Sequence, residues 1–131
     1  MIKSIDEKLF ESYLVWCKSH KFSPFPYEAL KHRAKFVFVD NKPILFFHLF
    51  FDSLCKSGFL GPIVRDPASD DKSVDLSIKL MAEWIRSNHS DLIFILTSTI
   101  IKKLSTRLQN NGFVECDKNV THLFLNPRKD L

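Results

Sequence analysis

Glycine is scarce in this sequence: among 131 residues it occurs at positions 58, 61 and 112. Walker-type and dinucleotide-binding loops need several glycines in one short segment, because their backbone amides approach phosphate oxygens closely. Three isolated glycines exclude both patterns. Few glycines and thirteen phenylalanines also argue against a disordered chain and favour a compactly folded one.

Cysteine is equally sparse. Cys17, Cys55 and Cys116 are odd in number, lie far apart and match no CxxC or Cys/His ligand spacing. We therefore expect neither a zinc site nor any other metal site, and no disulfide framework. The three thiols are expected to be reduced and to lie in the interior.

Long apolar runs and dense basic runs are also missing. No window reaches the roughly 18 consecutive apolar residues of a membrane span, and the N-terminal segment MIKSIDEKLF carries acidic residues where a signal peptide is apolar. The net charge of +4 is spread along the chain. These features predict a cytoplasmic protein with no membrane partner and no nucleic-acid partner. The length and the 45% hydrophobic content predict a single domain over residues 1–131.

The first quarter of the chain is predicted to be helical. Ser4 and Glu7 form an S-x-x-E capping box, which predicts a helix that continues to about residue 20. A short second helix is predicted over residues 26–34, with Pro26 in its first turn.

Strands follow these helices. Residues 35–39 and 43–51 form two strands joined by a turn at 40–42. The second strand is apolar on both faces, which indicates a central strand with helices packed above and below it. Residues 58–65 continue the sheet, with a kink or bulge at Pro62 because proline has no amide donor.

The second half alternates helices and strands. Apolar spacing from Ser73 predicts an amphipathic helix that Ser73 caps. Residues 91–97 form a short, continuously apolar strand, and a helix over 99–111 ends at Gly112 in a left-handed stop. A closing antiparallel hairpin is predicted from residues 113–116 and 120–125, with a turn at 117–119.

Three phrases carry a resemblance to a known family: GFLGPIVRDP at 58–67, SIKLMAEWIRSN at 77–88 and TRLQNNGFVEC at 106–116. They resemble the fourth strand, the long helix after it, and the last helix with its Gly-Phe exit in Gcn5-related N-acetyltransferases (GNATs). The predicted order of elements is similar over nearly the whole chain. The resemblance implies a mixed α+β fold, with a mostly antiparallel central sheet and helices on both faces.

The resemblance also implies a place for acetyl-CoA. In the family, an Arg/Gln-x-x-Gly-x-Gly/Ala loop wraps the pyrophosphate, whereas residues 66–75 here read DPASDDKSVD. Asp70 stands at the basic or amide position, and Ser73 and Asp75 stand at the glycine positions. Carboxylates without glycines make a poor phosphate site, because backbone amides cannot approach the oxygens and like charges repel. If coenzyme A binds at all, the resemblance assigns it to Ile63, Val64, Arg65, Lys72 and Ser73.

A purely structural reading of the same loop is also open. Asp70, Asp71 and Asp75 favour the positive end of the following helix, and Ser73 caps it.

Candidate catalytic groups are few. The family's frequent general acid, a tyrosine one turn before Gly-Phe, is absent, and Leu108 stands near its place. Ser105 or Thr106 is a candidate proton donor. His48 and Asp52 share one face of a strand by the period-two rule and are candidate bases. His122 is a further candidate base. The alternative for each histidine is that it is a buried, hydrogen-bonded core residue without a catalytic role.

Two functions from different classes remain. The loop at residues 66–75, which lacks the family's glycines, favours a non-enzymatic scaffold or binding protein. Such a protein needs no cofactor and binds a protein partner or belongs to an assembly. The chain is also similar to small acetyltransferase-like proteins among the internal virion proteins of short-tailed bacteriophages, which implies a virion or host-cytoplasm setting. The alternative is an acetyl-CoA-dependent N-acetyltransferase acting on an amine. Aromatic residues around the SPFP segment, Phe22, Phe25 and Tyr27, offer a partner surface or pack into the core.

Overall fold

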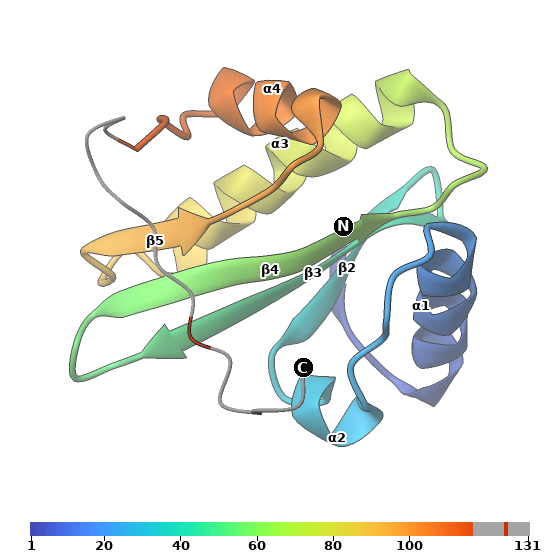
Figure 1. The fold of residues 1–131 in the computed structure, drawn as a ribbon, viewed down its shortest axis with the longest axis horizontal. Coiled ribbons are helices and arrows are strands. Elements are labelled where there is room, and N and C mark those ends of the chain that lie inside the picture. Colours follow the sequence, from blue (N-terminus) through green and yellow to red (C-terminus); the bar gives the residue numbers. More distant parts are fainter. Residues whose placement is uncertain (117–124, 126–131) are drawn as a thin grey trace.

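The computed structural model describes residues 1–116 and 125. Figure 1 shows one sheet with α3 and α4 on one face and α1 and α2 on the other. The elements in chain order are β1 (Ile2–Ser4), α1 (Glu7–Ser19), α2 (Tyr27–Leu30), β2 (Ala34–Val39), β3 (Lys42–Asp52), β4 (Ser57–Arg65), α3 (Asp71–Asn88), β5 (Phe94–Thr97) and α4 (Lys102–Asn110).

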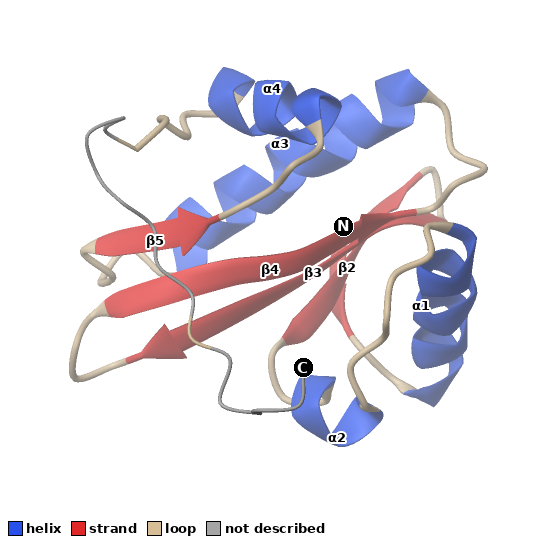
Figure 2. Cartoon of the chain, in the orientation of Figure 1, coloured by secondary structure: helices blue, strands red, loops and turns tan. Residues whose placement is uncertain are grey.

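The strands lie in the order β1-β2-β3-β4-β5. The first three pairings are antiparallel and β4 pairs with β5 in parallel. Figure 2 shows the same sheet sandwiched between helices. The expected mixed α+β class, with a mostly antiparallel sheet covered on both faces, is therefore confirmed.

The N-terminal segment differs from the prediction. Ser4 belongs to a short strand that pairs with β2, and its hydroxyl accepts a hydrogen bond from Nζ of Lys35 at 2.8 Å. Asp6 caps α1 instead, accepting from the backbone N–H of Leu9 at 2.7 Å. The predicted capping box is wrong because the strand pairing takes Ser4. The second helix is also shorter than predicted, and Pro26 is its N-cap.

The β2–β3 hairpin turns at Asp40 and Asn41, whose φ angles are +50° and +63°. Positive φ at both central residues is the type I′ arrangement, which matches the twist of the flanking strands and which Asp and Asn tolerate. The predicted turn is confirmed, and its last expected residue, Lys42, begins β3.

Strand β3 is the centre of the core, as its apolar sequence predicted: residues 44–49 are all buried. Its two faces contribute to separate clusters. Phe47 packs towards α3, with its ring centroid 5.7 Å from that of Trp84. Phe46 packs towards α1, with its centroid 4.2 Å from that of Tyr13. Burying rings on both faces fixes the register of β3, since a one-residue slip would exchange the two faces.

A bulge interrupts the β3–β4 ladder at the expected place. Phe47 pairs with Ile63 and Leu49 pairs with Leu60, so His48 faces two residues, Gly61 and Pro62. The extra residue falls where proline cannot donate a ladder hydrogen bond. The expected bulge at Pro62 is confirmed.

The C-terminal part is described as far as residue 116, with residue 125. Gly112 ends the last helix with φ +97°, as predicted. Helix α4 starts at Lys102, later than predicted. Residues 113–116 are not in a strand; the predicted first arm of the hairpin is wrong because Phe113 packs against the α3-side core after the glycine stop. The predicted turn at 117–119 and the second arm, apart from residue 125, lie outside the described residues.

Two of the cysteines also differ from expectation. Cys17 is buried on α1, where burial raises the pKa of its thiol. Cys55 and Cys116 are exposed, so the expectation of three interior thiols is wrong for these two. All three are free thiols.

Candidate functional site

A groove follows the free part of β4. The parallel pairing with β5 covers residues 57–60 of β4, and residues 61–65 extend beyond it. A groove of about 310 Å³ lies along this extension, between β4, α3 and α4. Its apolar lining includes Ile63, Val64, Val74, Ile78, Ile101 and Leu104, and three cations, Arg65, Lys103 and Arg107, also line it.

The alternation of hydrogen bonds along β4 decides which backbone groups face this groove. The N–H of Asp66 donates to the carbonyl of Ile44 on β3 at 2.8 Å. Because bonded and non-bonded pairs alternate in an antiparallel ladder, the peptide groups of Ile63 and Arg65 point away from β3. Nε2 of His20 lies 3.0 Å from the Arg65 carbonyl oxygen on that outer side. Ile63 therefore offers backbone groups to the groove.

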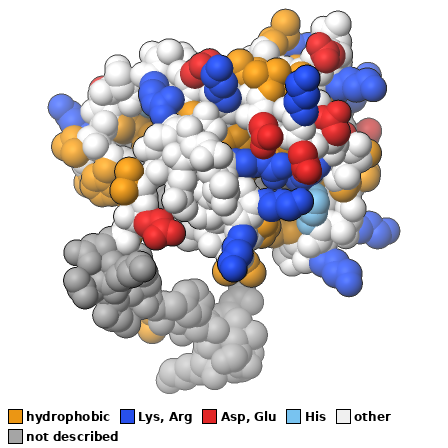
Figure 3. Space-filling view, turned by 90° about the horizontal axis from the view of Figure 1, so that it is seen from above, with side chains coloured by type: hydrophobic (Ala, Val, Ile, Leu, Met, Phe, Trp, Pro, Cys, Tyr) orange, Lys and Arg blue, Asp and Glu red, His pale blue; other side chains and the backbone are white. Residues whose placement is uncertain are grey.

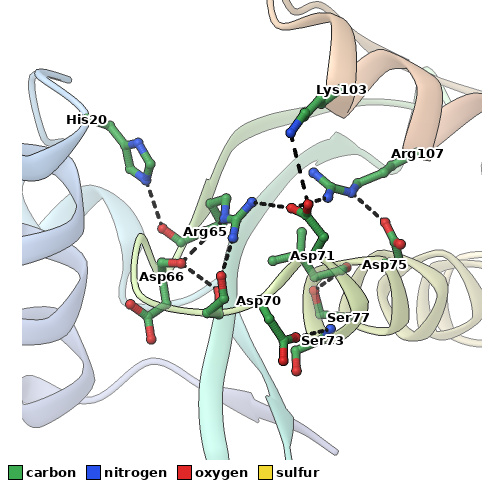
Figure 4. Close-up of polar contacts among 12 residues, drawn as sticks. His20, Arg65, Asp66, Asp70, Asp71, Ser73, Asp75, Ser77, Lys103 and Arg107 are labelled. Atoms are coloured by element: carbon green, nitrogen blue, oxygen red, sulfur yellow. Dashed lines mark hydrogen bonds and ion pairs between the residues drawn. The ribbon is translucent and has the colours of Figure 1, made fainter.

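The loop after β4 is closed by its own polar groups. Arg65 donates through Nη2 to the carbonyl of Ser69, and the Asp66 carboxylate accepts from the N–H of Ala68 at 2.9 Å. The Ser69 hydroxyl donates to the Asp66 carbonyl at 2.6 Å. Figure 4 shows the loop turning around the Arg65 side chain. These contacts fix the loop without glycine.

The N-terminus of α3 is capped by a carboxylate. Oδ1 of Asp70 accepts from the N–H of Ser73 at 2.7 Å, and this bond is the main cause of the lowered pKa of Asp70. The expectation that Ser73 caps this helix is therefore wrong, since α3 begins at Asp71, two residues earlier. One of the N–H groups that an external anion could use at this helix end, that of Ser73, is therefore already bonded to a carboxylate of the chain.

Three cationic side chains of the groove lie within ion-pair range of Asp71. Its carboxylate lies 3.0 Å from Nη2 of Arg107, 3.4 Å from Nη1 of Arg65 and 4.0 Å from Nζ of Lys103. Asp75, one turn along α3, accepts from Nε of Arg107 at 2.6 Å. The hydrogen bond from Arg107, then the charge of Lys103 and the bond from Arg65, hold the pKa of Asp71 below its usual range. We call these five residues the charge cluster (Figure 4).

The charge cluster alters the electrostatic argument made from the sequence. Arg65 and the loop after it hold two cations, Arg65 and Lys72, beside the four aspartates of residues 66–75. The fold adds Lys103 and Arg107 from α4, so acidic and basic groups balance. Figure 3 shows acidic and basic side chains interspersed over this face. The feature that disfavours an external anion is that Arg65, Lys103 and Arg107 already lie beside carboxylates of the chain.

A second, larger cavity lies on the other face of the sheet. Its volume is about 860 Å³, and α2, β3, β4 and β5 contribute to it. Both His48 and Asp52 line it, so the structure brings these two predicted residues together. Among the described residues, helices α1 and α2 cover the neighbouring part of this face.

His48 is 5% exposed, and its Nε2 has no hydrogen-bond partner among the described residues. Burial lowers the pKa of His48; a hydrogen bond with the backbone of Gly61 acts the other way, and the charge of Arg33 lowers it further. A bond that raises a histidine pKa is one that the ring donates. In the neutral tautomer that keeps its proton on Nδ1, Nε2 is an acceptor.

The other catalytic candidates are placed as follows. Asp52 accepts from the N–H groups of Leu54 and Cys55 at 2.8 and 3.0 Å, and these bonds, with that of Cys55 the larger, lower its pKa. Ser105 lies on the opposite face of the sheet from His48, where its hydroxyl accepts from Gln109 at 2.9 Å. The structure does not bring Ser105 into the cavity that His48 and Asp52 line. Thr106 is exposed on α4, and His122 lies outside the described residues.

The five predicted cofactor residues lie in two places, the groove along β4 and the first turn of α3. Ile63, Val64 and Arg65 line the groove. Lys72 and Ser73 lie in the first turn of α3, where Lys72 is exposed and Ser73 has its N–H bonded to Asp70. Lys103, Arg107 and His20 are site residues that the sequence did not reveal, since each lies far along the chain from its partner.

This chain resembles known proteins in its structure. No protein-family model matches the sequence, and no curated protein matches it. Solved structures do match. A ribosomal-protein-alanine N-acetyltransferase from Brucella melitensis aligns with a TM-score of 0.61 at 13% identity, over 96% of this chain and 99% of that one.

Two further structures agree. An aminoglycoside 6'-N-acetyltransferase from Acinetobacter haemolyticus has a TM-score of 0.56 at 15% identity, over 96% and 99% of the two chains. A putative acetyltransferase of the GNAT family from Xanthomonas campestris has a TM-score of 0.58 at 16% identity, over 95% and 92%. The chain has the GNAT fold. The resemblance inferred from the three sequence phrases is confirmed at the level of the fold.

The residues present do not fit the phosphate end of the cofactor that the GNAT fold implies. The N–H of Ser73 is bonded to Asp70, and Arg65, Lys103 and Arg107 are within ion-pair range of Asp71. A diphosphate would have to displace these internal carboxylates and then lie beside them.

Two other classes of site were sought in the described parts of the chain. No group of three or more His, Cys, Asp or Glu side chains in residues 1–116 and 125 is arranged to hold a metal ion. No helix within the same residues is long and apolar enough to cross a membrane.

Proposed function

We propose that this chain is a non-enzymatic scaffold or binding protein with a GNAT fold, which does not use coenzyme A. The observation that carries the proposal is the charge cluster. Asp71 and Asp75 pair with the cations of the groove. Without these carboxylates, the same cations would be available to bind an external diphosphate.

Three further features support the proposal. The loop of residues 66–70 is closed by its own hydrogen bonds and has no glycine at which a phosphate could approach the backbone. Asp70 caps α3. Leu108, at the place of the family's tyrosine, is 3% exposed and packs in the α3-side core, so it brings no polar group to the groove.

A scaffold needs a surface for its partner. Phe22, next to the SPFP segment, and Phe25, within it, are 40% and 48% exposed, whereas Tyr27 packs edge-on against Phe10 with ring centroids 5.3 Å apart. Phe22 and Phe25 therefore offer apolar anchors for a protein partner, and Tyr27 supports the core. The proposal includes assembly into a virion as the setting, on the strength of the phage resemblance.

Thermal unfolding in the presence of acetyl-CoA tests the proposal. A ligand at one hundred times its Kd stabilises a protein by about 2.7 kcal/mol, so a micromolar site would raise Tm by several degrees at 100-fold excess over Kd. We expect no shift with acetyl-CoA. A clear, saturable shift would overturn the scaffold function.

A second candidate is an acetyl-CoA-dependent N-acetyltransferase acting on an amine of a small molecule or protein. The observation that favours it is the buried His48, whose neutral Nε2 accepts a proton or hydrogen bond in an open cavity. The backbone of Ile63 at the groove adds support. This candidate predicts acetylation of an amine panel that disappears in His48→Leu, and absence of turnover at millimolar acetyl-CoA would reject it.

A further inference from the structure

Phenylalanine is the most frequent residue type in the lining of the cavity on the α2 side of the sheet. Five large apolar side chains of the lining are each 46–60% exposed: Phe25, Phe50, Phe59, Phe94 and Leu96. By the period-two rule, Phe50 and His48 share a face of β3, and Phe94 and Leu96 share a face of β5. A concave apolar surface of about 860 Å³ with few polar groups is typical of a small-molecule site.

The polar groups of this cavity are mostly engaged. Nη1 of Arg33 donates to the carbonyl of Phe51 at 2.9 Å, and its guanidinium lies 4.4 Å from the centroid of the Phe51 ring. The Asp52 carboxylate is bonded to two backbone N–H groups. Nε2 of His48 is the buried side-chain polar atom that lacks a partner among the described residues. His48 is also one of the residues that line the cavity.

Charge decides which donors suit this acceptor. A protonated amine would approach the Arg33 guanidinium, and Oδ1 of Asp52, the carboxylate among the described lining residues, already accepts from two backbone N–H groups. A neutral N–H or O–H donor has no such conflict. The ring of Phe50, 60% exposed with its centroid 5.4 Å from that of His48, can turn aside to admit it.

We infer that this cavity binds a neutral, largely apolar aromatic small molecule that donates one hydrogen bond to Nε2 of His48. An unsubstituted indole or a phenol has the required chemistry: a flat apolar body that packs between the phenylalanine rings and a single donor. This inference goes beyond the scaffold function and does not depend on whether coenzyme A binds.

Indole and 1-methylindole form a matched pair of probes, since they differ in the N–H donor. Backbone amide NMR titrations of the full chain should show shifts at Arg33, Phe59 and Gly61 with indole. We expect 1-methylindole to bind about fivefold more weakly, the value of one neutral hydrogen bond of about 1 kcal/mol. Tryptamine, which is cationic, should bind more weakly than indole.

Variants assign the effect to His48. His48→Leu should remove the discrimination between the two indoles, whereas His32→Leu, at an exposed histidine outside the lining, should leave it unchanged. His48→Gln keeps an acceptor and guards against a variant that fails to fold. It should retain part of the discrimination.

Several results would overturn the inference. These are equal affinity of the wild-type chain for the two indoles, stronger binding of tryptamine than of indole, and unchanged discrimination in His48→Leu. A fourth is a dimer in light scattering whose formation shifts the same lining amides, because a second copy of the chain would then be the occupant.

Discussion

Nε of Arg107 on α4 lies 2.6 Å from Oδ1 of Asp75 on α3, and the same guanidinium reaches Asp71 one turn earlier. This contact joins two helices through residues that are 32 positions apart in sequence. The Arg107 side chain is 12% exposed, whereas the two carboxylates are more than 60% exposed. One cation thus ties the start of α3 to the last helix at the edge of the groove.

Replacing Arg107 should loosen this junction. In Arg107→Leu, Asp71 and Asp75 lose their shared cation, and we expect Tm to fall at low salt and the loss to shrink at high salt, because salt screens the remaining charges. Lys103→Leu is the matched control. Its ammonium is 4.0 Å from Asp71 and 74% exposed, so its effect on Tm should be smaller. Equal losses in the two variants would contradict the assigned geometry.

Stability should depend on pH through buried histidine. The folded-state pKa of His48 is lowered, so between that pKa and the unfolded value of about 6.5 the unfolded chain binds more protons than the folded chain. The free energy of unfolding should therefore fall as pH drops below about 6.5, by at most about 1.4 kcal/mol per pH unit for one group. His89 has a lowered pKa for the same main reason, burial, and contributes with the same sign.

Denaturant titrations at a series of pH values check this prediction. His48→Gln should flatten the dependence below about pH 6.5, and His89→Gln should remove a further part. The aspartates act in a separate window. The pKa values of Asp52, Asp70 and Asp71 are lowered, so their stabilisation is lost below the unfolded value of about 3.9. A slope unaffected by His48→Gln would contradict the buried neutral imidazole.

Restoring the family's tyrosine should not restore a proton donor. Leu108 is buried in the core, so Leu108→Tyr adds volume to a packed site and should lower the unfolding free energy by about 1–3 kcal/mol. Leu108→Ala should lower it by about 2–5 kcal/mol through lost burial and a cavity. Denaturant titration measures both. Unchanged stability in Leu108→Tyr would show that position 108 faces open space.

Much of the fold follows from local patterns. The apolar run of β3 predicts a central strand because such a strand needs cover on both faces. Gly112 and Pro62 mark the helix stop and the bulge, since each residue type has a specific backbone consequence. Ser4 misleads because a capping motif competes with strand pairing, which depends on a distant partner.

The site was harder to predict, because its contacts join distant segments. Asp71 is visible in the acidic loop, but its main partner Arg107 is 36 residues away and lies among other basic residues of α4. His48 and Asp52 could be placed on one face from their spacing alone. That Nε2 of His48 lacks a partner depends on packing from several elements, which no local pattern contains.

The central claim is that internal carboxylates take the place of the cofactor's phosphates. Calorimetric titration of acetyl-CoA into Asp71→Asn/Asp75→Asn, beside the wild-type chain, tests it most directly. Asparagine keeps the size of each side chain and suits Asp75 better than glycine would, because Asp75 lies inside α3. Asp70→Gly, which removes the carboxylate cap, is the companion variant.

The account predicts no measurable heat of binding for the wild-type chain and a saturable binding isotherm for the double variant, tightened further by Asp70→Gly. Micromolar binding by the wild-type chain that is unchanged or weakened in the double variant would contradict it.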